Sequence, residues 1–468
     1  MTAARIPGPP IPMIAGLSVF SDSFKTPMKL YQRYGKLVSL NATRSGGNLM
    51  AFGPEYNRQV FTNTADFYTI DSDSFPVKLP RDTALYRLWN NGLLQMNGER
   101  HDQQRRLMLP ALHKKQINHY RTLMIAETEK RLGSWKVGDT VDVLKEMRAL
   151  TAAIAIRAFL GMDPETDGMT LHRLFSEWAK MIQSPVNMAM PVDIPGSPFH
   201  RMLVRSEEVE QELAALLGRK RAALKDSETQ DGLSALIQAQ DEDGTRLTEN
   251  EIMGQIGTFY IAGHETTAST LTWALLLLAQ HPDVYTQLVE ELSPLKGSAP
   301  SAEQGDQFLL LDKVIKETMR LFPPLPFVVR TSRVPFSMGG AEFPARISVG
   351  LSAFVTHRLP EIYSDADKFL PERWDGAAPS PYEYIPFSAG PRMCLGASFA
   401  MAEMKIVLPV IIGCYRLANP PNARVDYQAS IFAAPRGGLP MEIRTHNGTF
   451  PPRPIRGSLR EVVDLPRN

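Results

Sequence analysis

One of the two cysteines, Cys394, lies in a glycine-rich stretch immediately before a predicted helix, in the sequence YIPFSAGPRMCLGASFAMAEMK of residues 384–405. A thiolate that binds iron must stay charged and partly desolvated, and it needs backbone N–H groups directed at the sulfur. A helix that begins just after Cys394 supplies such donors. Gly390 allows a tight turn and Gly396 lets the backbone approach a ligand closely, because neither residue has a Cβ. The stretch therefore predicts a thiolate iron site, with a buried structural cysteine as the alternative.

A carboxylate and a hydroxyl lie side by side in the longest predicted helix. Thr248 and Glu251 have the spacing of a capping box, and the sequence then runs through IMGQIGTFYIAGHETTASTLTWALLLLAQH without proline until Pro282. Few faces of this helix carry charge, so we expect it to be buried in the middle of the protein. Glu265 and Thr266 lie within it, and a carboxylate in such a position needs a functional explanation.

The complete spacing around the cysteine is Phe387-x-x-Gly390-x-Arg392-x-Cys394-x-Gly396. It resembles the haem-binding loop of the cytochrome P-450 family of haem-thiolate monooxygenases, and five motifs in the family's order extend the resemblance from about residue 30 to residue 445. The resemblance implies that Cys394 is the axial ligand of haem b (iron protoporphyrin IX). Phe387, Gly390, Arg392 and Gly396 then belong to the loop that binds this cofactor.

Two further motifs fit the same family. KETMR supplies Glu317 and Arg320, whose spacing puts both charges on one helical face. FLPERW supplies Arg373, which by resemblance completes a buried Glu-Arg-Arg network behind the haem, with Trp374 in place of the commoner Phe. Taken alone, such a pair is more often a solvated surface salt bridge.

The segment AGHETTAS resembles the family's oxygen-activation motif, with Glu265 as the acid and Thr266 as the alcohol. Reduction of dioxygen at haem iron needs protons delivered to oxygen in a site that is otherwise dry. The resemblance therefore implies that these two residues are catalytic, whereas the three letters ETT alone are more often an ordinary helix face.

Haem propionates need cationic partners. In GERHDQQRR, His101 and Arg105 are four residues apart and share one helical face, as in the bacterial form of the family motif. The resemblance assigns the remaining positions to Arg330, His357 and Arg392. For any one of these cations, simple solvation at the surface is the alternative.

The resemblance also implies an apolar substrate pocket. Phe259, Ala262 and Thr266 share one face of the long helix, and family positions add Leu325, Val328 and Phe432. We therefore expect a lipophilic substrate such as a fatty acid, terpenoid, steroid or polyketide. A peroxygenase or isomerase that uses a peroxide is an alternative, although such enzymes usually depart from the acid–alcohol pair. A non-catalytic haem sensor is a second alternative.

Composition limits the other partners. The formal net charge of the 468 residues is +1 and no long basic run occurs, which argues against nucleic acid. No stretch of about 18 apolar residues predicts a membrane span, and the proline-interrupted N-terminus is not a signal peptide. The two cysteines favour a reduced cytoplasmic setting, with Cys414 expected in the core.

With no flavin or iron–sulfur segment evident, we expect electrons from a ferredoxin and its reductase. We expect these partners to dock near Arg105, Arg106, Lys114, Lys115 and Lys405.

We expect a mainly α fold with small β-sheets, with the haem between the long helix and the cysteine loop. Residues 1–468 are expected to form one cytochrome P-450 haem domain, with a proline-rich lead-in at 1–30 and a tail at 446–468. Predicted helices cover about 99–134, 144–160, 167–183, 202–223, 283–294, 309–321 and 396–412, and predicted strands include LVSLNAT, LMAFG and RISVGLSAFV.

Overall fold

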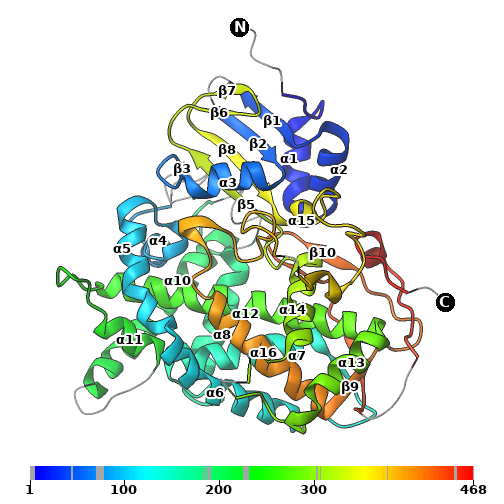
Figure 1. The fold of residues 1–468 in the computed structure, drawn as a ribbon. Helices are drawn as coiled ribbons and strands as arrows, with labels where there is room; N and C mark the ends of the chain where they lie inside the picture. Colours follow the sequence, from blue (N-terminus) through cyan, green and yellow to red (C-terminus); the bar gives the residue numbers. More distant parts are fainter. Residues whose placement is uncertain are drawn as a thin grey trace. The chain divides into compact units, whose positions relative to one another are not determined.

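The computed structural model describes residues 6–43, 46–69, 79–182, 184, 187, 191–224, 231–301, 304–305, 307–376, 378–446 and 451–466. The chain forms two compact units. Unit 1 comprises Met1–Phe67, Met124–Leu150 and Thr266–Asn468, and unit 2 comprises Tyr68–Leu123 and Thr151–Glu265. Both units are rich in helices, and the expected mainly α fold with small sheets is confirmed (Figure 1).

Unit 2 is helical. It contains α4 (Ala84–Asn90), η1 (Leu93–Gln95), α5 (Gly98–Met108), η2 (Leu109–Leu112), the start of α6 (Lys114–Leu132), the π-turn η3 (Ile156–Leu160), α8 (Gly168–Ile182), α10 (Pro198–Ala223) and α11 (Gly232–Gln238). Helices α8 and α10 pack together, and the indole of Trp178 donates a hydrogen bond of 2.8 Å to the Ser206 hydroxyl between them.

Unit 1 holds the sheets. The largest sheet has the strand order β1 (Leu37–Thr43), β2 (Gly46–Ala51), β8 (Ile347–Ser352), β5 (Phe327–Ser332), β3 (Phe67–Tyr68). Strands β2 and β8 are parallel, whereas β1 and β2, and β5 and β8, are antiparallel. Smaller sheets pair β10 (Tyr427–Ala429) with β11 (Ala433–Pro435), β6 (Phe336–Met338) with β7 (Ala341–Phe343), and β12 (Pro440–Thr445) with both β4 (Thr140–Asp142) and β9 (Tyr415–Ala418). Alternate β-branched and aliphatic side chains of the largest sheet form a buried core cluster.

Unit 1 also contains helices. They are α1 (Pro12–Ser21), α2 (Lys25–Tyr34), α3 (Pro54–Thr62), α7 (Val143–Ala155, which continues into unit 2), α13 (Pro282–Leu292), η4 (Ser293–Leu295), α14 (Leu309–Leu321), α15 (Ala353–Thr356), η5 (Pro371–Trp374), η6 (Gly390–Arg392), α16 (Ala397–Cys414) and η7 (Ser458–Glu461). Among the described residues, α16 is the one helix long and apolar enough to cross a membrane, and more than half of it is buried, as in a core helix.

The predicted long helix is α12 (Glu249–Gln280), which contributes to both units. Its N-terminus carries the expected capping box: Glu251 N donates to Thr248 Oγ1 at 3.3 Å, and Thr248 N donates to Glu251 Oε2 at 3.0 Å. From Ile252 onward most of its side chains are buried, as predicted.

Two expectations need correction. The single helix expected over 99–134 is three elements, because Pro110 lacks the N–H that would continue α5. Cys414 is exposed, since it is the last residue of α16, where the helix leaves the core. The predicted boundaries of the lead-in and the tail stay predictions. The segment 1–30 contains α1 and the first six residues of α2. In the predicted tail, the side chains of Ile455, Leu459, Val462, Val463 and Leu465 are buried.

Candidate functional site

The cysteine loop of unit 1 is a tight turn that leads into α16. Gly390 has φ +70°, and a Cβ at this position would lie 2.3 Å from the carbonyl oxygen of Phe61, so only glycine fits. The N–H of Cys394 donates to the carbonyl of Phe387 at 2.8 Å, and the thiol is exposed. At Gly396, the N-cap of α16, a Cβ would lie 4.0 Å from the Cys394 sulfur. The loop thus holds a thiol at its surface at the start of a long helix.

Behind this loop, α14 and η5 bring together Glu317, Arg320 and Arg373. Arg320 and Glu317 are fully buried, and the guanidinium donates two hydrogen bonds of 2.8 Å to the carboxylate. Arg373 Nε donates to the same carboxylate at 3.3 Å. Three backbone carbonyls accept the remaining Arg320 N–H groups: those of His357, Ala366 and Lys368. A buried ion pair with this many partners holds its segments in one arrangement.

Trp374 is a fourth member of this network, which the sequence analysis missed. Its indole Nε1–H donates to Glu317 Oε2 at 3.1 Å. The sequence shows Trp374 where the family more often has Phe. An indole N–H can only donate a hydrogen bond, so this residue could have been expected to donate to the carboxylate of the network.

The structure gives His357 different partners from those predicted. The side chain is fully buried; Nε2 accepts a hydrogen bond of 2.9 Å from Ile385 N, and Nδ1 lies 3.2 Å from the Arg320 carbonyl oxygen. Burial, together with the nearby Arg320 charge, lowers the pKa of this imidazole to about 3. Both ring nitrogens are used by the backbone, so the structure does not support a propionate contact of His357.

Arg330 on β5 is a shielded cation. Its guanidinium lies over the Phe61 ring at 5.9 Å and donates to the carbonyl of Val329 at 3.0 Å. Burial lowers the pKa of the guanidinium to about 10, and no carboxylate pairs with it among the described residues. Phe61 also contacts Gly390, so Phe61 is a neighbour of both Arg330 and the cysteine loop. A desolvated cation of this kind fits an anionic ligand.

The acid and the alcohol lie in α12, where the run of buried residues is interrupted. Ala262 is exposed and Glu265 and Thr266 are partly buried, whereas Thr267–Leu278 are all buried. Side chains bind the helix carbonyls here: His264 Nδ1 lies 2.6 Å from the Tyr260 oxygen, and Thr270 Oγ1 donates to the Thr266 oxygen at 3.1 Å. Such bonds compete with the helix ladder and loosen it locally.

Glu403 on α16 is a further buried acid that the sequence analysis did not select. Burial raises the pKa of its carboxyl well above the usual range, and the Thr267 hydroxyl on α12 opposes that rise only in part. Burial therefore favours the neutral form of this carboxyl. The sequence around Glu403 did not indicate that this residue would face α12.

In unit 2, α5 carries His101 and Arg105. His101 is buried, with Nδ1 2.9 Å from Asp102 Oδ1, and Arg105 is partly buried. Helix α5 is fixed to the first half of α12, because Gln255 Nε2 donates to Gln104 Oε1 at 3.0 Å. The two cations remain predicted propionate partners.

The predicted pocket residues fall in both units. In unit 2, Phe259 stacks on Phe159 with ring centroids 4.9 Å apart, so Phe159 joins the apolar face of α12. In unit 1, Leu325 is exposed, Phe432 and Val328 are partly buried, and Val328 packs against the sheet core.

Backbone contacts tie the two pocket segments of unit 1 to α12. Ala433 N donates to the Pro324 carbonyl at 3.2 Å, and Trp273 Nε1 on α12 donates to the Ala433 carbonyl at 3.1 Å. The segments of Leu325 and Phe432 therefore lie together beside the second half of α12.

Two of the five cations predicted for partner docking are already paired. Lys405 lies 3.0 Å from Asp312 and is 14% exposed, and Arg106 lies 3.0 Å from Asp241. Lys114 and Lys115 are exposed at the start of α6.

Comparisons with known proteins agree with this geometry. The family model for cytochrome P-450 matches residues 6–435. The cyclooctat-9-en-7-ol 5-monooxygenase of Streptomyces melanosporofaciens is 31% identical over 400 residues, which covers 83% of this chain and 84% of that protein. Two solved structures share the fold: retinoic acid-bound cyanobacterial CYP120A1 (TM-score 0.80, 23% identity, covering 95% of this chain and 100% of that one) and the haem domain of cytochrome P-450DA (TM-score 0.81, 22% identity, covering 95% and 98%). With its cysteine loop, its buried Glu-Arg-Arg network and a family match over most of its length, the chain belongs to the cytochrome P-450 family of haem-thiolate monooxygenases.

Proposed function

We propose that the protein binds haem b through Cys394 and inserts one oxygen atom of O2 into a lipophilic small molecule, with electrons from a separate protein. The observation that carries this proposal is the Glu265–Thr266 pair beside the exposed Ala262, within a helix that is otherwise buried and apolar. An acid and an alcohol at such a place suit proton delivery in a dry site.

The residues of unit 1 fit a haem. Cys394 offers an exposed thiol on a loop whose glycine cannot be replaced, and a thiolate is the soft ligand that haem iron accepts. Arg330 is a shielded cation that lacks a carboxylate partner among the described residues, which suits a propionate. Arg392 lies between the loop glycine and the cysteine and is proposed as a second partner. When bound, the haem supplies the iron at which O2 is reduced.

Protons are proposed to reach the reaction through α12. Glu265 takes up a proton at its carboxylate and passes it toward Thr266. The Oγ1 of Thr266 would hold the group that carries this proton in place. The buried residues that flank this segment keep other water away, so that protons arrive by this route.

The substrate is proposed to be largely hydrocarbon. Phe259, Ala262, Leu325, Val328 and Phe432 carry no charge, and Phe159 adds a stacked ring. One relative is named as a cyclooctat-9-en-7-ol 5-monooxygenase, and the molecule in that name is mainly hydrocarbon. We propose that a ferredoxin with its reductase supplies the electrons.

A labelling experiment tests the proposal. The haem-loaded protein is first screened for substrate-induced spectral shifts with a library of terpenoids, steroids, fatty acids and polyketides. The best binder is then incubated with NADPH, a ferredoxin, its reductase and isotopically labelled O2. We expect a product that carries one labelled oxygen atom and needs NADPH. A product formed only with hydrogen peroxide would instead indicate a peroxygenase. If NADPH were not consumed in the presence of any compound, a haem sensor would be favoured.

A further inference from the structure

The first half of α12, in unit 2, presents one side to the segment that leads into α5. Gly254, Gln255 and Thr258 are one helix turn apart, so they lie along this side. The same spacing continues to Ala262 and then to Glu265. The side of α12 that meets the segment before α5 is therefore continuous with the side that carries the predicted pocket residue and the predicted acid.

Two glycines allow this segment to approach α12 closely. A Cβ at Gly254 would lie 2.5 Å from the carbonyl oxygen of Asn91. A Cβ at Gly92 would lie 2.6 Å from Thr258 Oγ1. Both distances are shorter than van der Waals contact, so only glycine permits this approach at either position. The chain between α4 and η1 thus lies with its backbone against α12.

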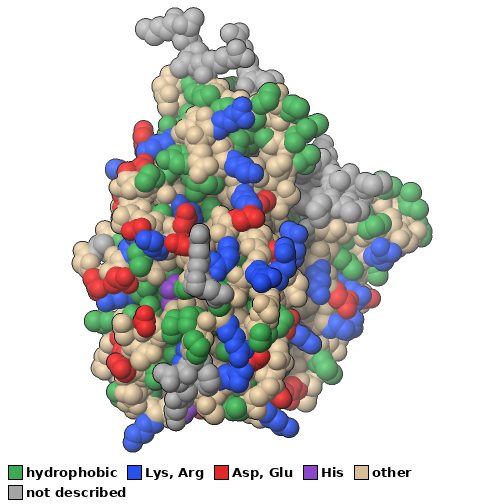
Figure 2. Space-filling view, turned by 90° about the vertical axis from the view of Figure 1, so that its right-hand side faces the viewer, with side chains coloured by type: hydrophobic (Ala, Val, Ile, Leu, Met, Phe, Trp, Pro, Cys, Tyr) green, Lys and Arg blue, Asp and Glu red, His purple; other side chains and the backbone are tan. Residues whose placement is uncertain are grey.

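Gln255 forms the polar contact between these parts. Its Oε1 accepts a hydrogen bond of 2.9 Å from Leu93 N at the start of η1, and its Nε2 donates one of 3.0 Å to Gln104 Oε1 on α5. Gln255 is 0% exposed and Gln104 is 3% exposed. Charged side chains of both signs lie on the surface drawn in Figure 2, whereas this contact is buried and made of neutral amides. A buried amide without a partner is costly, so the two bonds hold η1 and α5 in one place beside α12.

The residue that Gln255 binds on α5 lies between the two predicted propionate partners. Gln104 follows His101 by one helix turn and directly precedes Arg105. Because side chains on one helix move together, fixing Gln104 fixes the rotation of α5 about its axis and the directions of both cations.

We propose that Gln255 is a positioning residue of the haem site. It holds α5 beside α12 so that His101 and Arg105 can bind the haem propionates. This inference rests on the proposed function, because it takes the binding of haem as given. It adds a residue that contacts neither the cofactor nor the substrate and acts through Gln104.

The test replaces Gln255 by Leu in the full haem-loaded chain. The change leaves Leu93 N and Gln104 Oε1 without their partner, so α5 can shift. We expect the propionate bending bands in the resonance Raman spectrum of the ferric protein to move. Haem transfer to apomyoglobin should become about tenfold faster, the size expected when a hydrogen bond to a charged group is weakened.

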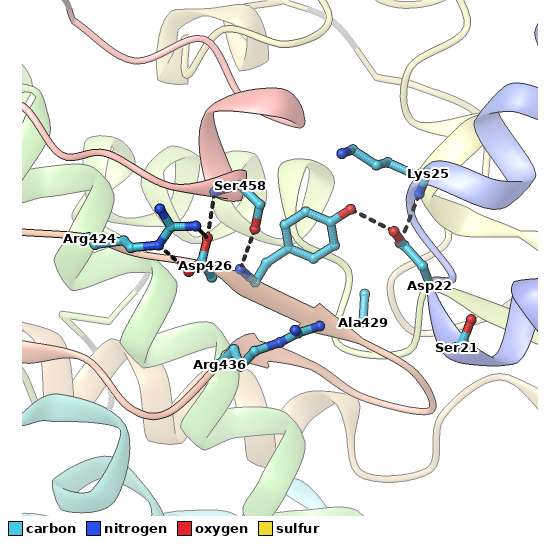
Figure 3. Close-up of a pocket in the computed structure, with 9 residues that line it drawn as sticks. Ser21, Asp22, Lys25, Arg424, Asp426, Ala429, Arg436 and Ser458 are labelled. Carbon is cyan, nitrogen blue, oxygen red and sulfur yellow. Dashed lines mark hydrogen bonds and ion pairs between the residues drawn. The ribbon is translucent and has the colours of Figure 1, made fainter.

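Two controls remove buried hydrogen bonds elsewhere. Gln280, the last residue of α12, is also 0% exposed, and its amide donates to Asn419 Oδ1 at 2.8 Å and to the Arg453 carbonyl at 2.9 Å. Gln280→Leu is therefore matched in residue type, helix and burial. Tyr427→Phe removes the hydrogen bond of 2.9 Å to Asp22 in the polar pocket where α1 ends (Figure 3). Both controls should lower stability in urea but keep the propionate bands and the rate of haem loss of the parent.

Two further variants complete the test. Gln104→Leu removes only the bond to α5 and serves if Gln255→Leu does not fold. It should move the bands in the same direction, and combining it with Gln255→Leu should add little, because the two residues act through one contact. Arg105→Gln reports on the propionate contact itself.

Three results would overturn the proposal. If Arg105→Gln moved the bands while Gln255→Leu and Gln104→Leu did not, the inference would be wrong and the proposed function would stand. If Arg105→Gln changed neither the bands nor haem loss, α5 would not bind the propionates, and this part of the proposed function would fall with the inference. If Gln280→Leu had the same effect as Gln255→Leu, the effect would come from a general loss of stability.

Discussion

Replacing Glu317 by Gln tests the buried network behind the cysteine loop. The carboxylate accepts five hydrogen bonds: two from Arg320 and one each from Arg373, Trp374 and Leu370 N. The amide keeps the volume but removes the negative charge and turns an NH2 group toward these donors. Because Arg320 is fully buried, it would be left as an unpaired charge.

Breaking a buried pair in this way costs about 3–5 kcal/mol of unfolding free energy. Trp374→Phe, which removes one hydrogen bond to a charged group, should cost about 1.5–3 kcal/mol. The matched control is Glu361→Gln, which breaks the exposed pair with Lys36 (2.7 Å) and should cost at most about 1 kcal/mol.

Urea unfolding of the haem-loaded proteins, followed by far-ultraviolet circular dichroism, gives the midpoint and slope for each variant. We expect the stability order parent, Glu361→Gln, Trp374→Phe, Glu317→Gln. If Glu317→Gln lost no more stability than Glu361→Gln, the network would not hold Arg320 in its buried position, and the reasoning would be refuted.

Three other predictions concern the site. Thr266→Ala should consume NADPH at a comparable rate but release most reduced oxygen as hydrogen peroxide and little as product; full coupling of NADPH to product would show that another group supplies the hydroxyl. Arg330→Gln should keep the fold but lose haem faster to apomyoglobin than the parent, and an unchanged loss rate would remove Arg330 from the propionate contacts. Glu403 has a raised folded-state pKa, so its contribution to stability is complete below the unfolded pKa of about 4.3 and falls as pH rises, by up to about 1.4 kcal/mol per pH unit. Urea melts across the pH range should therefore show a steeper loss for the parent than for Glu403→Gln, and parallel curves would contradict the raised pKa of Glu403.

The sequence predicted those elements that are determined by residues close to one another in the chain. The capping box at Thr248 and Glu251 defines the start of α12, and the proline at 282 follows its end, so this helix could be predicted closely. The Glu317–Arg320 pair follows from spacing on one helix turn, whereas its contact with Arg373 was implied only by the resemblance to the family.

The errors came from residues whose role depends on distant neighbours. His357 stands in a family motif, but the sequence does not contain the direction of its ring, which the backbone of Ile385 and Arg320 decides. Cys414 ends an apolar run, and only the packing of α16 shows that the run leaves the core there. Glu403 looks like a solvated helix residue until α12 is placed beside it.

The most direct test of the central claim is the absorption spectrum of the reduced carbon monoxide complex. If Cys394 is the axial ligand, the parent chain should show the strongly red-shifted Soret band of thiolate-bound haem. Cys414→Ser should keep that band, because Cys414 lies at the far end of α16, and Cys394→His should lose it. A red-shifted band that persists in Cys394→His would contradict the assignment of Cys394 as the haem ligand.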